Sequence, residues 1–523
     1  MKDLNLKPIF SQKEKKIVTG LIIFLIVLVI LPEVYGFSTA PENKVFTWLP
    51  AIGFGFDYNA YYAWANQASQ NRILMEILYT SESHPALFFH PVFYLIGQIN
   101  RLTGFSLELI FFIFSILANV LLLLVIYRFI SFFVSSLSRR IFSFIFVSLG
   151  SGLAWTSRPI SADFFMPELN LFTTMRWPIL MSLGLALTLI ALVLFIKSLA
   201  EEGTKNQVLA IFSLFFLTLI HPYDIFIFYG LALSYLFFFT KFWQKQKILK
   251  TVSIFLAPLP VIIYILLINN SSLVWQEHST SSMLSPNFFK YFLGLFPFFI
   301  FLPFSFKEIV RKKKLQLLFV WLITYFVLVY LPLSFQRRLV MGIFVPLGIL
   351  AGTGLSNLTH FFKKHSFHKC LVCSFVIFSV LFLSFRIFFI LDLSIHRLKE
   401  KSFPLYLSED FVASFDWLKN NVQSDEVIFS SYWTGNFIPR YSGKKVFLGH
   451  WAQTIFAQEK IEIVKDFFSD KLSEEEINKL FKNHNIQYIF YSQLEEEIGK
   501  IDLDRFGNKV FENNEVKIIK IAL

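Results

Sequence analysis

The stretch KEKKIVTGLIIFLIVLVILPEVYG, residues 13–36, sets three lysines directly before a long apolar run. A helix of about 20 mostly apolar residues crosses a bilayer, and cytoplasmic loops carry an excess of lysine and arginine. The same pattern returns along the chain and predicts a mostly α polytopic membrane protein with about eleven transmembrane helices. The predicted spans are 17–36, 105–135, 141–157, 176–197, 207–220, 224–240, 251–268, 288–306, 315–332, 339–358 and 370–391.

The basic clusters fix the orientation of these spans. With the N-terminus inside, every cluster falls in a cytoplasmic segment and most of the candidate polar chemistry falls outside. The clusters are Lys13, Lys15 and Lys16; Arg139 and Arg140; Lys197 and Lys205; Lys241, Lys245, Lys247 and Lys250; Arg311 to Lys314; and Lys363, Lys364 and Lys369.

The composition agrees with this assignment. Of the 523 residues, 55% are hydrophobic and 16% are charged, as expected of a polytopic membrane protein. The net charge of +12 follows mostly from the cytoplasmic segments, where anionic lipid headgroups are the natural neighbours. We therefore expect membrane lipids, and no nucleic acid, as partners. The only cysteines, Cys370 and Cys373, begin the last span, so no disulfide is expected in an outer domain.

Residues 207–242 form an apolar run that is broken at His221-Pro222-Tyr223-Asp224. As one helix this run would be about 54 Å long, against a hydrocarbon core of about 30 Å. One crossing would also put the lysines at 241–250 outside. Two short helices joined by an outer turn are therefore predicted.

Two regions lie outside the predicted membrane part. The first outer loop, 37–104, holds a predicted helix at 58–80 and an interfacial helix at 86–102. From residue 393 onward turn residues and periodic charge replace long apolar runs. We predict a transmembrane domain over 1–392 and a small extracytoplasmic α/β domain over 393–523, with strands at 427–431, 445–449, 487–491 and 516–521 and helices at 408–421, 455–469 and 473–484.

Asp57 opens the sequence Asp57-Tyr58-Asn59-Ala60-Tyr61-Tyr62-Ala63-Trp64, just outside the predicted first span. One interpretation is a helix N-cap, because aspartate accepts backbone N–H groups there. The other is catalysis: the carboxylate accepts a hydroxyl proton while the rings of Tyr58, Tyr61 and Trp64 cover the C–H faces of a sugar. The two roles are compatible, and both stay open.

Asp163 and Glu168 lie in the second substantial outer loop. Neighbouring carboxylates bind a hard divalent cation, Mg or Mn, or raise one another's pKa for acid–base work. Alternatively, they are loop charges that pair with Arg158 and Arg176.

His221 and Asp224 flank the proline turn and either hold that turn or support a site. Arg337 and Arg338 lie at an outer end, against the charge trend. Two guanidinium groups suit phosphate oxygens, although pairing with an outer carboxylate would also account for them. Arg386, within the last span, is expected to snorkel or to pair with Asp392.

The arrangement resembles the GT-C superfamily of polytopic glycosyltransferases, which use polyprenyl-phosphate-linked sugars, and within it a bacterial group related to protein O-mannosyltransferases and aminoarabinose transferases. The resemblance assigns the catalytic aspartate to Asp57, the second acidic motif to Asp163 and Glu168, and a proline-containing interfacial helix to the region that follows His84-Pro85. The matching pieces are Met166-Pro167-Glu168-Leu169-Asn170-Leu171-Phe172, His221-Pro222-Tyr223-Asp224, Gln336-Arg337-Arg338-Leu339 and Gly449-His450-Trp451-Ala452-Gln453-Thr454.

The last piece falls in the C-terminal domain, where it either closes over a site and binds acceptor or only maintains the domain. No clear counterpart of the oligosaccharyltransferase Trp-Trp-Asp motif is present, which disfavours sequon glycosylation.

The resemblance implies an inverting glycosyltransferase on the outer face of a bacterial cytoplasmic membrane. It would move a sugar from a polyprenyl-phosphate donor to a glycan, lipid or protein acceptor. Asp57 would be the general base, Arg337 and Arg338 would bind the donor phosphate, His221 and Asp224 would support the site, and His84 would contact sugar or acceptor. A divalent cation is the one cofactor to consider. The alternatives are a transporter or lipid flippase, which predicts ionisable groups at the bilayer midplane, and an inactive scaffold.

Overall fold

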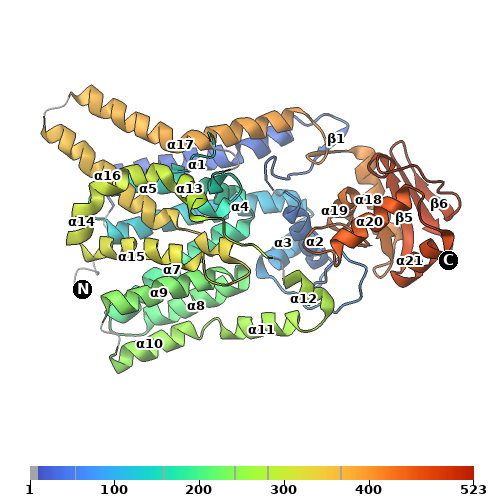
Figure 1. The fold of residues 1–523 in the computed structure, drawn as a ribbon, viewed down its shortest axis with the longest axis horizontal. Coiled ribbons are helices and arrows are strands. Elements are labelled where there is room, and N and C mark those ends of the chain that lie inside the picture. Colours follow the sequence, from blue (N-terminus) through green and yellow to red (C-terminus); the bar gives the residue numbers. More distant parts are fainter. Residues whose placement is uncertain are drawn as a thin grey trace. The chain divides into compact units, whose positions relative to one another are not determined.

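The computed structural model describes residues 10–53, 55–156, 160–240, 243–279, 282–365 and 368–522 (Figure 1). Within these residues, seven helical segments are long and apolar enough to cross a membrane, and each coincides with a predicted span. They are α1 (Gln12–Ser38), α4 (Leu107–Phe133), α7 (Ile179–Ala200), α10 with α11 (Lys245–Asn269), α13 to α14 (Phe288–Arg311), η5 with α16 (Gln336–Lys364) and α17 (Lys369–Lys399).

The other four predicted spans fall on shorter helices: α5 (Leu137–Leu149), α8 (Lys205–Ile220), α9 (Asp224–Phe239) and α15 (Lys313–Leu328). The predicted break is confirmed, because α8 ends at Ile220 and α9 begins at Asp224. The fold class is therefore confirmed as a mostly α multi-pass membrane protein with a small sheet in its C-terminal region.

The described chain divides into two compact units. Unit 1 comprises Met1–Pro32, Ile113–Tyr264 and Ser282–Ser394, and unit 2 comprises Glu33–Phe112, Ile265–Ser281 and Ile395–Leu523. The first outer loop thus clusters with the C-terminal region and not with the helices that follow it. The predicted boundary at 392/393 stays a prediction about where the membrane part ends.

In unit 1, small residues allow helices to approach closely, as is common in membrane proteins. A Cβ on Gly352 of α16 would lie 2.5 Å from the backbone of Ser143 in α5. A Cβ on Gly184 of α7 would lie 2.6 Å from Oδ2 of Asp224, at the start of α9. The connecting elements are η2 (Ala162–Phe164), η3 (Pro167–Leu169) and α6 (Leu171–Arg176). The segment Phe288–Arg311 consists of α13 (Phe288–Phe301), η4 (Leu302–Ser305) and α14 (Phe306–Arg311), and the segment Gln336–Lys364 contains η5 (Gln336–Val340) and α16 (Phe344–Lys364).

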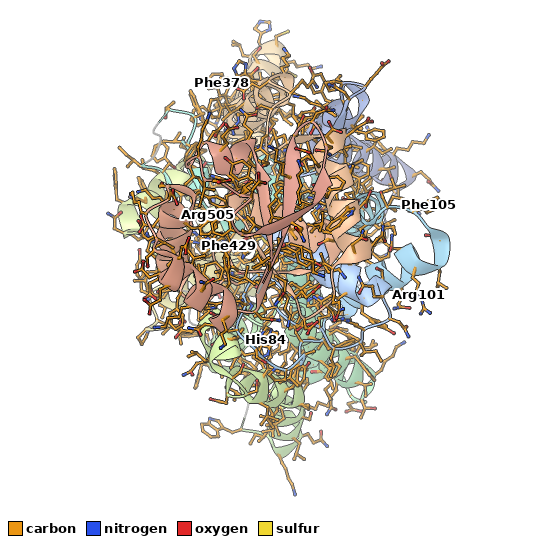
Figure 2. The ribbon with its side chains drawn as sticks, turned by 90° about the vertical axis from the view of Figure 1, so that its right-hand side faces the viewer. His84, Arg101, Phe105, Phe378, Phe429 and Arg505 are labelled. Carbon is orange, nitrogen blue, oxygen red and sulfur yellow. The ribbon has the colours of Figure 1, made fainter. Side chains whose placement is uncertain are left out.

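Unit 2 contains a five-stranded sheet in the order β4-β3-β5-β7-β6, with β3 parallel to β4 and β5 and the other pairs antiparallel. Its core packs around Phe429, which Figure 2 marks, with Phe447, Phe467 and Phe481. The loops after β3 and β4 leave the same edge of the sheet, because parallel strands end together. The strands are β3 (Val427–Phe429), β4 (Lys445–Val446), β5 (Ile486–Ser492), β6 (Gly507–Glu512) and β7 (Val516–Ile521).

The predicted helices of this region are α18 (Glu409–Asn421), α20 (Ala457–Phe468) and α21 (Glu474–Asn483). Two of the elements that were not predicted in this region are informative. One is the edge strand β6, whose pattern is mostly exposed. The other is α19 (Tyr432–Ser442), which contains Pro439, a residue that normally argues against a helix. The region also contains the four-residue helix α22 (Gln493–Glu496).

The first outer loop contributes α2 (Asp57–Ser69) and α3 (Pro91–Thr103), and its strand β1 (Lys44–Phe46) pairs with β2 (Tyr406–Ser408). The prediction of one helix over 58–80 was wrong, because Asn71 adopts a left-handed conformation with φ of 67° just after α2 ends. Helix α3 packs closely on α2, since a Cβ on Gly97 would lie 2.4 Å from the carbonyl oxygen of Ala65. Arg101 and Phe105 mark the C-terminal end of α3 in Figure 2. A further short helix of this unit is α12 (Leu273–Ser279).

Candidate active site

Asp57 is the first residue of α2 and makes its polar contacts with the C-terminal region of unit 2. Its Oδ1 lies 3.1 Å from Nε2 of His450 and accepts the indole N–H of Trp451, also at 3.1 Å. The N-cap position belongs to Phe56, so the capping interpretation of Asp57 was wrong. The carboxylate still gains from the helix, because a negative charge in the first turn interacts favourably with the helix dipole.

The hydrogen bond at the second ring nitrogen of His450, Nδ1, indicates which nitrogen carries the proton. Nδ1 of His450 accepts the backbone N–H of Ala452 at 3.2 Å, so Nδ1 carries no proton in this arrangement. Nε2 must then carry the proton of the neutral ring and donate it to Asp57. Oδ1 of Asp57 therefore receives two neutral N–H donors, which stabilise the ionised carboxylate without neutralising its charge.

The carboxylate is partly open, and its two partners differ in exposure. The Asp57 side chain is 24% exposed while that of His450 is 4% exposed. Trp451, in contrast, is 44% exposed. Tyr432 lies alongside: burial raises the pKa of its hydroxyl, and the nearby Asp57 carboxylate raises it further. The arrangement is a fixed, accessible carboxylate beside an open aromatic ring.

The aromatic residues of α2 that the sequence singled out pack against other aromatic rings. Tyr61 stacks on Phe93 with ring centroids 5.1 Å apart, and Tyr58 contacts Tyr61 at 6.3 Å. Trp64 is buried against Phe88, with ring centroids 4.5 Å apart. The predicted sugar contact by Trp64 does not fit this burial, because a buried ring cannot cover the face of a ligand.

His84, marked in Figure 2, holds its own loop. Its Nε2 accepts the backbone N–H of Ile77 at 3.0 Å, and its Nδ1 lies 2.8 Å from the carbonyl oxygen of Glu82. Burial lowers the pKa of His84. Both ring nitrogens are thus engaged by backbone groups, which gives His84 a structural role instead of the predicted contact with substrate.

Arg337 and Arg338 form a second candidate site, in η5 of unit 1. Nη2 of Arg337 lies 3.7 Å from Oε1 of Glu168, and Nε of Arg337 is buried with no hydrogen-bond partner among the described residues. Nε of Arg338 donates to Sδ of Met283 at 3.3 Å, and thioether sulfur is a weak acceptor. The pair therefore keeps hydrogen-bonding capacity that a phosphate group would satisfy.

The proline turn at 221–224 contacts this arginine pair through Tyr223, a residue to which the sequence analysis assigned no role. The guanidinium carbon of Arg338 lies 4.3 Å from the centre of the Tyr223 ring, a cation–π distance. Nδ1 of His221 lies 2.9 Å from Oδ1 of Asp224, and both side chains are buried. His221 and Asp224 thus fix the turn that presents Tyr223 to Arg338, which is a supporting position.

Asp163 is placed very differently from Asp57. It is fully buried, its Oδ2 lies 3.0 Å from Nε of Arg386, and Gly152 donates its backbone N–H to Oδ2 at 3.0 Å. Ser161 also donates to its Oδ1, and Arg386 also donates to its backbone oxygen. The predicted pairing of Arg386 with Asp392 was wrong; Arg386 anchors the Asp163 loop to α17.

The two acidic residues do not present a cation site. Asp163 is neutralised by Arg386, and Glu168 faces Arg337, so each carboxylate already has a positive partner. In the part of the chain that the structure describes, no three His, Cys, Asp or Glu side chains are grouped to hold a metal ion. The predicted alternative pairing with Arg158 lies outside the described residues, and Arg176 donates to Ser394.

No protein-family model and no curated protein sequence matches this chain. Solved structures do. ArnT from Cupriavidus metallidurans bound to undecaprenyl phosphate aligns with a TM-score of 0.56 and 11% identity, over 95% of this chain and 97% of that chain. The oligosaccharyltransferase AglB from Archaeoglobus fulgidus, in complex with an inhibitory peptide and a dolichol-phosphate, aligns with a TM-score of 0.56 and 11% identity, over 93% of this chain and 70% of that chain.

The arabinofuranosyltransferase AftD from Mycobacteria aligns with a TM-score of 0.51 and 11% identity, over 96% of this chain but only 40% of that longer chain. All three neighbours are GT-C glycosyltransferases. This chain has the GT-C fold. The resemblance seen in the sequence is thereby confirmed at the level of fold, and two of these neighbours carry a polyprenyl phosphate.

Proposed function

We propose that this chain is a glycosyltransferase that moves a sugar from a polyprenyl-phosphate donor to a hydroxyl acceptor on the outer face of the cytoplasmic membrane. The observation that supports the proposal most strongly is the exposure and the hydrogen bonding of the Asp57 carboxylate. It is a partly exposed carboxylate at the start of α2, and its Oδ1 accepts the indole N–H of Trp451 and lies 3.1 Å from Nε2 of the buried His450. A general base needs such a group: ionised, accessible and fixed in direction.

In the proposed step, Asp57 accepts the proton of the acceptor hydroxyl as the hydroxyl oxygen attacks the anomeric carbon. The bond from that carbon to the donor's phosphate oxygen breaks, and polyprenyl phosphate leaves with the electron pair. Attack from the face opposite the phosphate inverts the anomeric configuration. Phosphate is a good leaving group at neutral pH, so the step needs no strong general acid.

Arg337 and Arg338 would bind the phosphate of the donor. Their partners in the described residues are weak: a thioether, an aromatic face and a carboxylate 3.7 Å away. Charge-assisted hydrogen bonds to phosphate would satisfy the unpartnered Nε of Arg337 and stabilise the charge that develops on the leaving group. Asp163 takes no part in the step, because its charge is already compensated by Arg386.

The test is transfer of label from radiolabelled polyprenyl-phosphate sugars in membranes that contain wild-type protein or Asp57→Asn. Asparagine keeps the oxygen that accepts the two N–H donors but cannot take up a proton. We expect a loss of about 100-fold or more, the size of a general-base contribution. Asp416→Asn, at an exposed position of α18, is the matched control and should transfer as wild type does.

Equal transfer by wild type and Asp57→Asn would remove Asp57 from the mechanism. Absence of transfer by wild type from every sugar tried would favour the transporter or scaffold alternatives. No observation in the described residues favours a flippase, since the one arginine singled out within a span, Arg386, is fully buried and paired with Asp163.

A further inference from the structure

The side chains around Asp57 also bear on the chemical class of the acceptor. Two tryptophans of unit 2 are nearly half exposed: Trp433, at 45%, and Trp451, at 44%. Large apolar side chains that stay open beside a polar group usually mark a binding surface. Tryptophan combines a flat apolar face with one N–H donor, which suits ligands that have both C–H faces and hydroxyls.

Both tryptophans are linked to Asp57 through neighbouring residues. Trp451 donates its indole N–H directly to Oδ1 of Asp57. Trp433 contacts the ring of Phe56, the residue before Asp57, with centroids 5.4 Å apart. Tyr432 joins the two sides, since its ring contacts Trp433 with centroids 5.4 Å apart and its hydroxyl lies near the backbone of Trp451. Trp451 thus contacts the carboxylate directly, and Trp433 is linked to it through Phe56 and Tyr432.

The two segments that carry these tryptophans are locked together. Trp433 lies in the first turn of α19, which follows β3, and Trp451 lies in the loop after β4, at the edge of the sheet where parallel strands end. A Cβ on Gly435 would lie 1.9 Å from the carbonyl oxygen of Leu448, and a Cβ on Gly449 would lie 2.6 Å from that of Gly435. Asn436 donates to the carbonyl oxygens of Tyr432 and Gly449 at 2.8 Å each. The rings are thus held on a rigid support, which lowers the entropic cost of binding.

We propose that the acceptor is a carbohydrate chain and that Trp433 and Trp451 bind it with one of its hydroxyls at Asp57. This inference rests on the proposed function, which requires a hydroxyl nucleophile. A pyranose ring presents a flat C–H face that matches an indole ring, together with hydroxyls at its edge. A serine or threonine side chain offers a hydroxyl without such a face.

Trp451 is not explained as an anchor in the membrane interface. Such anchors direct their N–H groups to lipid headgroups and water. The N–H of Trp451 is instead used by Asp57, which fixes the ring plane relative to the proposed base. Exposure of the ring and commitment of its polar atom to a candidate general base together favour a substrate platform.

The test is binding, which needs no donor. Purified full-length protein in lipid nanodiscs is titrated with four tetrasaccharides, of glucose, mannose, N-acetylglucosamine and rhamnose, and with a blocked threonine-containing tetrapeptide, by saturation-transfer difference NMR. We expect at least one tetrasaccharide to bind wild type, with affinity reduced about tenfold or more in Trp433→Ala and Trp451→Ala. Trp451→Phe, which keeps an aromatic face, should restore most of the binding.

The matched control is Trp417→Ala, in α18. Its ring packs on Tyr488 and on Phe511 of β6, the strand at the opposite edge of the sheet from β4, so tetrasaccharide binding should not change. Binding of no tetrasaccharide, binding that both tryptophan variants retain, or binding of the tetrapeptide alone would overturn the inference.

Asp57→Asn separates this inference from the proposed function. It should still bind the tetrasaccharide, because both tryptophans remain and the amide oxygen still accepts the indole N–H of Trp451, while losing transfer. If the tetrasaccharide binds but transfer does not depend on Asp57, the proposed mechanism is rejected, while the proposal that the two tryptophans bind the acceptor stands. If transfer depends on Asp57 but on neither tryptophan, the proposal that the tryptophans bind the acceptor is rejected, while the proposed mechanism stands.

Discussion

Asp57 and Asp163 are both acidic residues of predicted outer loops, and the structure gives them opposite surroundings. Asp57 is partly exposed and accepts neutral N–H groups from His450 and Trp451. Asp163 is fully buried and pairs with the guanidinium of Arg386. A carboxylate stays available for chemistry when one side of it is open to solvent, and it is withdrawn from chemistry when it is buried against a counter-ion. The partner, more than the residue type, separates the candidate catalyst from the structural acid.

The largest effect on stability is expected from breaking the buried pair. Asp163→Asn leaves the Arg386 charge buried without its counter-ion, which should cost about 3–5 kcal/mol of folding free energy. Thermal unfolding of the purified protein measures this loss, and transfer per folded molecule should stay close to wild type. The double variant Asp163→Asn with Arg386→Met should recover stability, because it removes the uncompensated charge. A stable Asp163→Asn protein without activity would instead give Asp163 a catalytic role.

Replacing the arginine pair should affect binding of the donor, not folding. Arg337→Gln and Arg338→Gln are each expected to raise the KM for the donor about tenfold, since each removes charge-assisted hydrogen bonds to phosphate. Steady-state kinetics with varied donor measures this change. Arg338→Lys keeps the charge but loses the planar stacking on Tyr223, and should recover only part of the affinity.

The control for these variants is Arg101→Gln, at an exposed position of α3, which should leave the KM for the donor unchanged. An unchanged KM in both arginine-pair variants would show that the donor phosphate binds elsewhere.

Glu82 is a third carboxylate, and its ion pair with Lys460 should make the stability of the protein depend on pH. Burial raises its pKa, but the Lys460 ammonium 2.8 Å away and hydrogen bonds to Glu82 outweigh burial and hold the pKa below its ordinary value. The stability from this pair is therefore present above about pH 4.3 and is lost as the pH falls through the lowered pKa. Glu82→Gln should lower the free energy of unfolding by about 2 kcal/mol near pH 7, because Lys460 is buried.

Thermal unfolding between pH 3 and pH 7 checks this prediction, since Glu82→Gln should flatten the acid limb of the curve. Asp466→Asn provides the control: that carboxylate is exposed and lies 3.5 Å from an exposed Lys471, so little change is expected. An acid limb that does not change in Glu82→Gln would argue against the pair.

The last prediction concerns His450, which we assign as a positioning residue. His450→Ala removes one donor from Asp57 and should lower kcat about tenfold while the KM for the donor stays constant. His450→Gln places an amide N–H near the same oxygen and should recover part of the rate. A loss of stability with no change in kcat per folded molecule would reduce His450 to a structural residue.

Local pattern was enough to predict most of the fold, because membrane spans and their basic flanks are read from consecutive residues. The break at His221-Pro222-Tyr223-Asp224 followed from the length of the apolar run and from the side on which the lysines at 241–250 would fall, and it was confirmed. Contacts between side chains far apart in the sequence produce no such local pattern. His450 lies 393 residues from Asp57, and Arg386 lies 223 residues from Asp163. The sequence marked His450 and Trp451 only as part of a resemblance, without indicating that they contact Asp57.

The central claim is tested most directly by comparing Asp57→Asn and Asp163→Asn as purified proteins, with single-turnover transfer measured per folded molecule. We predict that Asp57→Asn unfolds at the wild-type temperature and transfers about 100-fold to 10,000-fold more slowly. We predict that Asp163→Asn unfolds at a lower temperature and transfers at nearly the wild-type rate while folded. Wild-type transfer by Asp57→Asn, or a folded Asp163→Asn that does not transfer, would contradict the account.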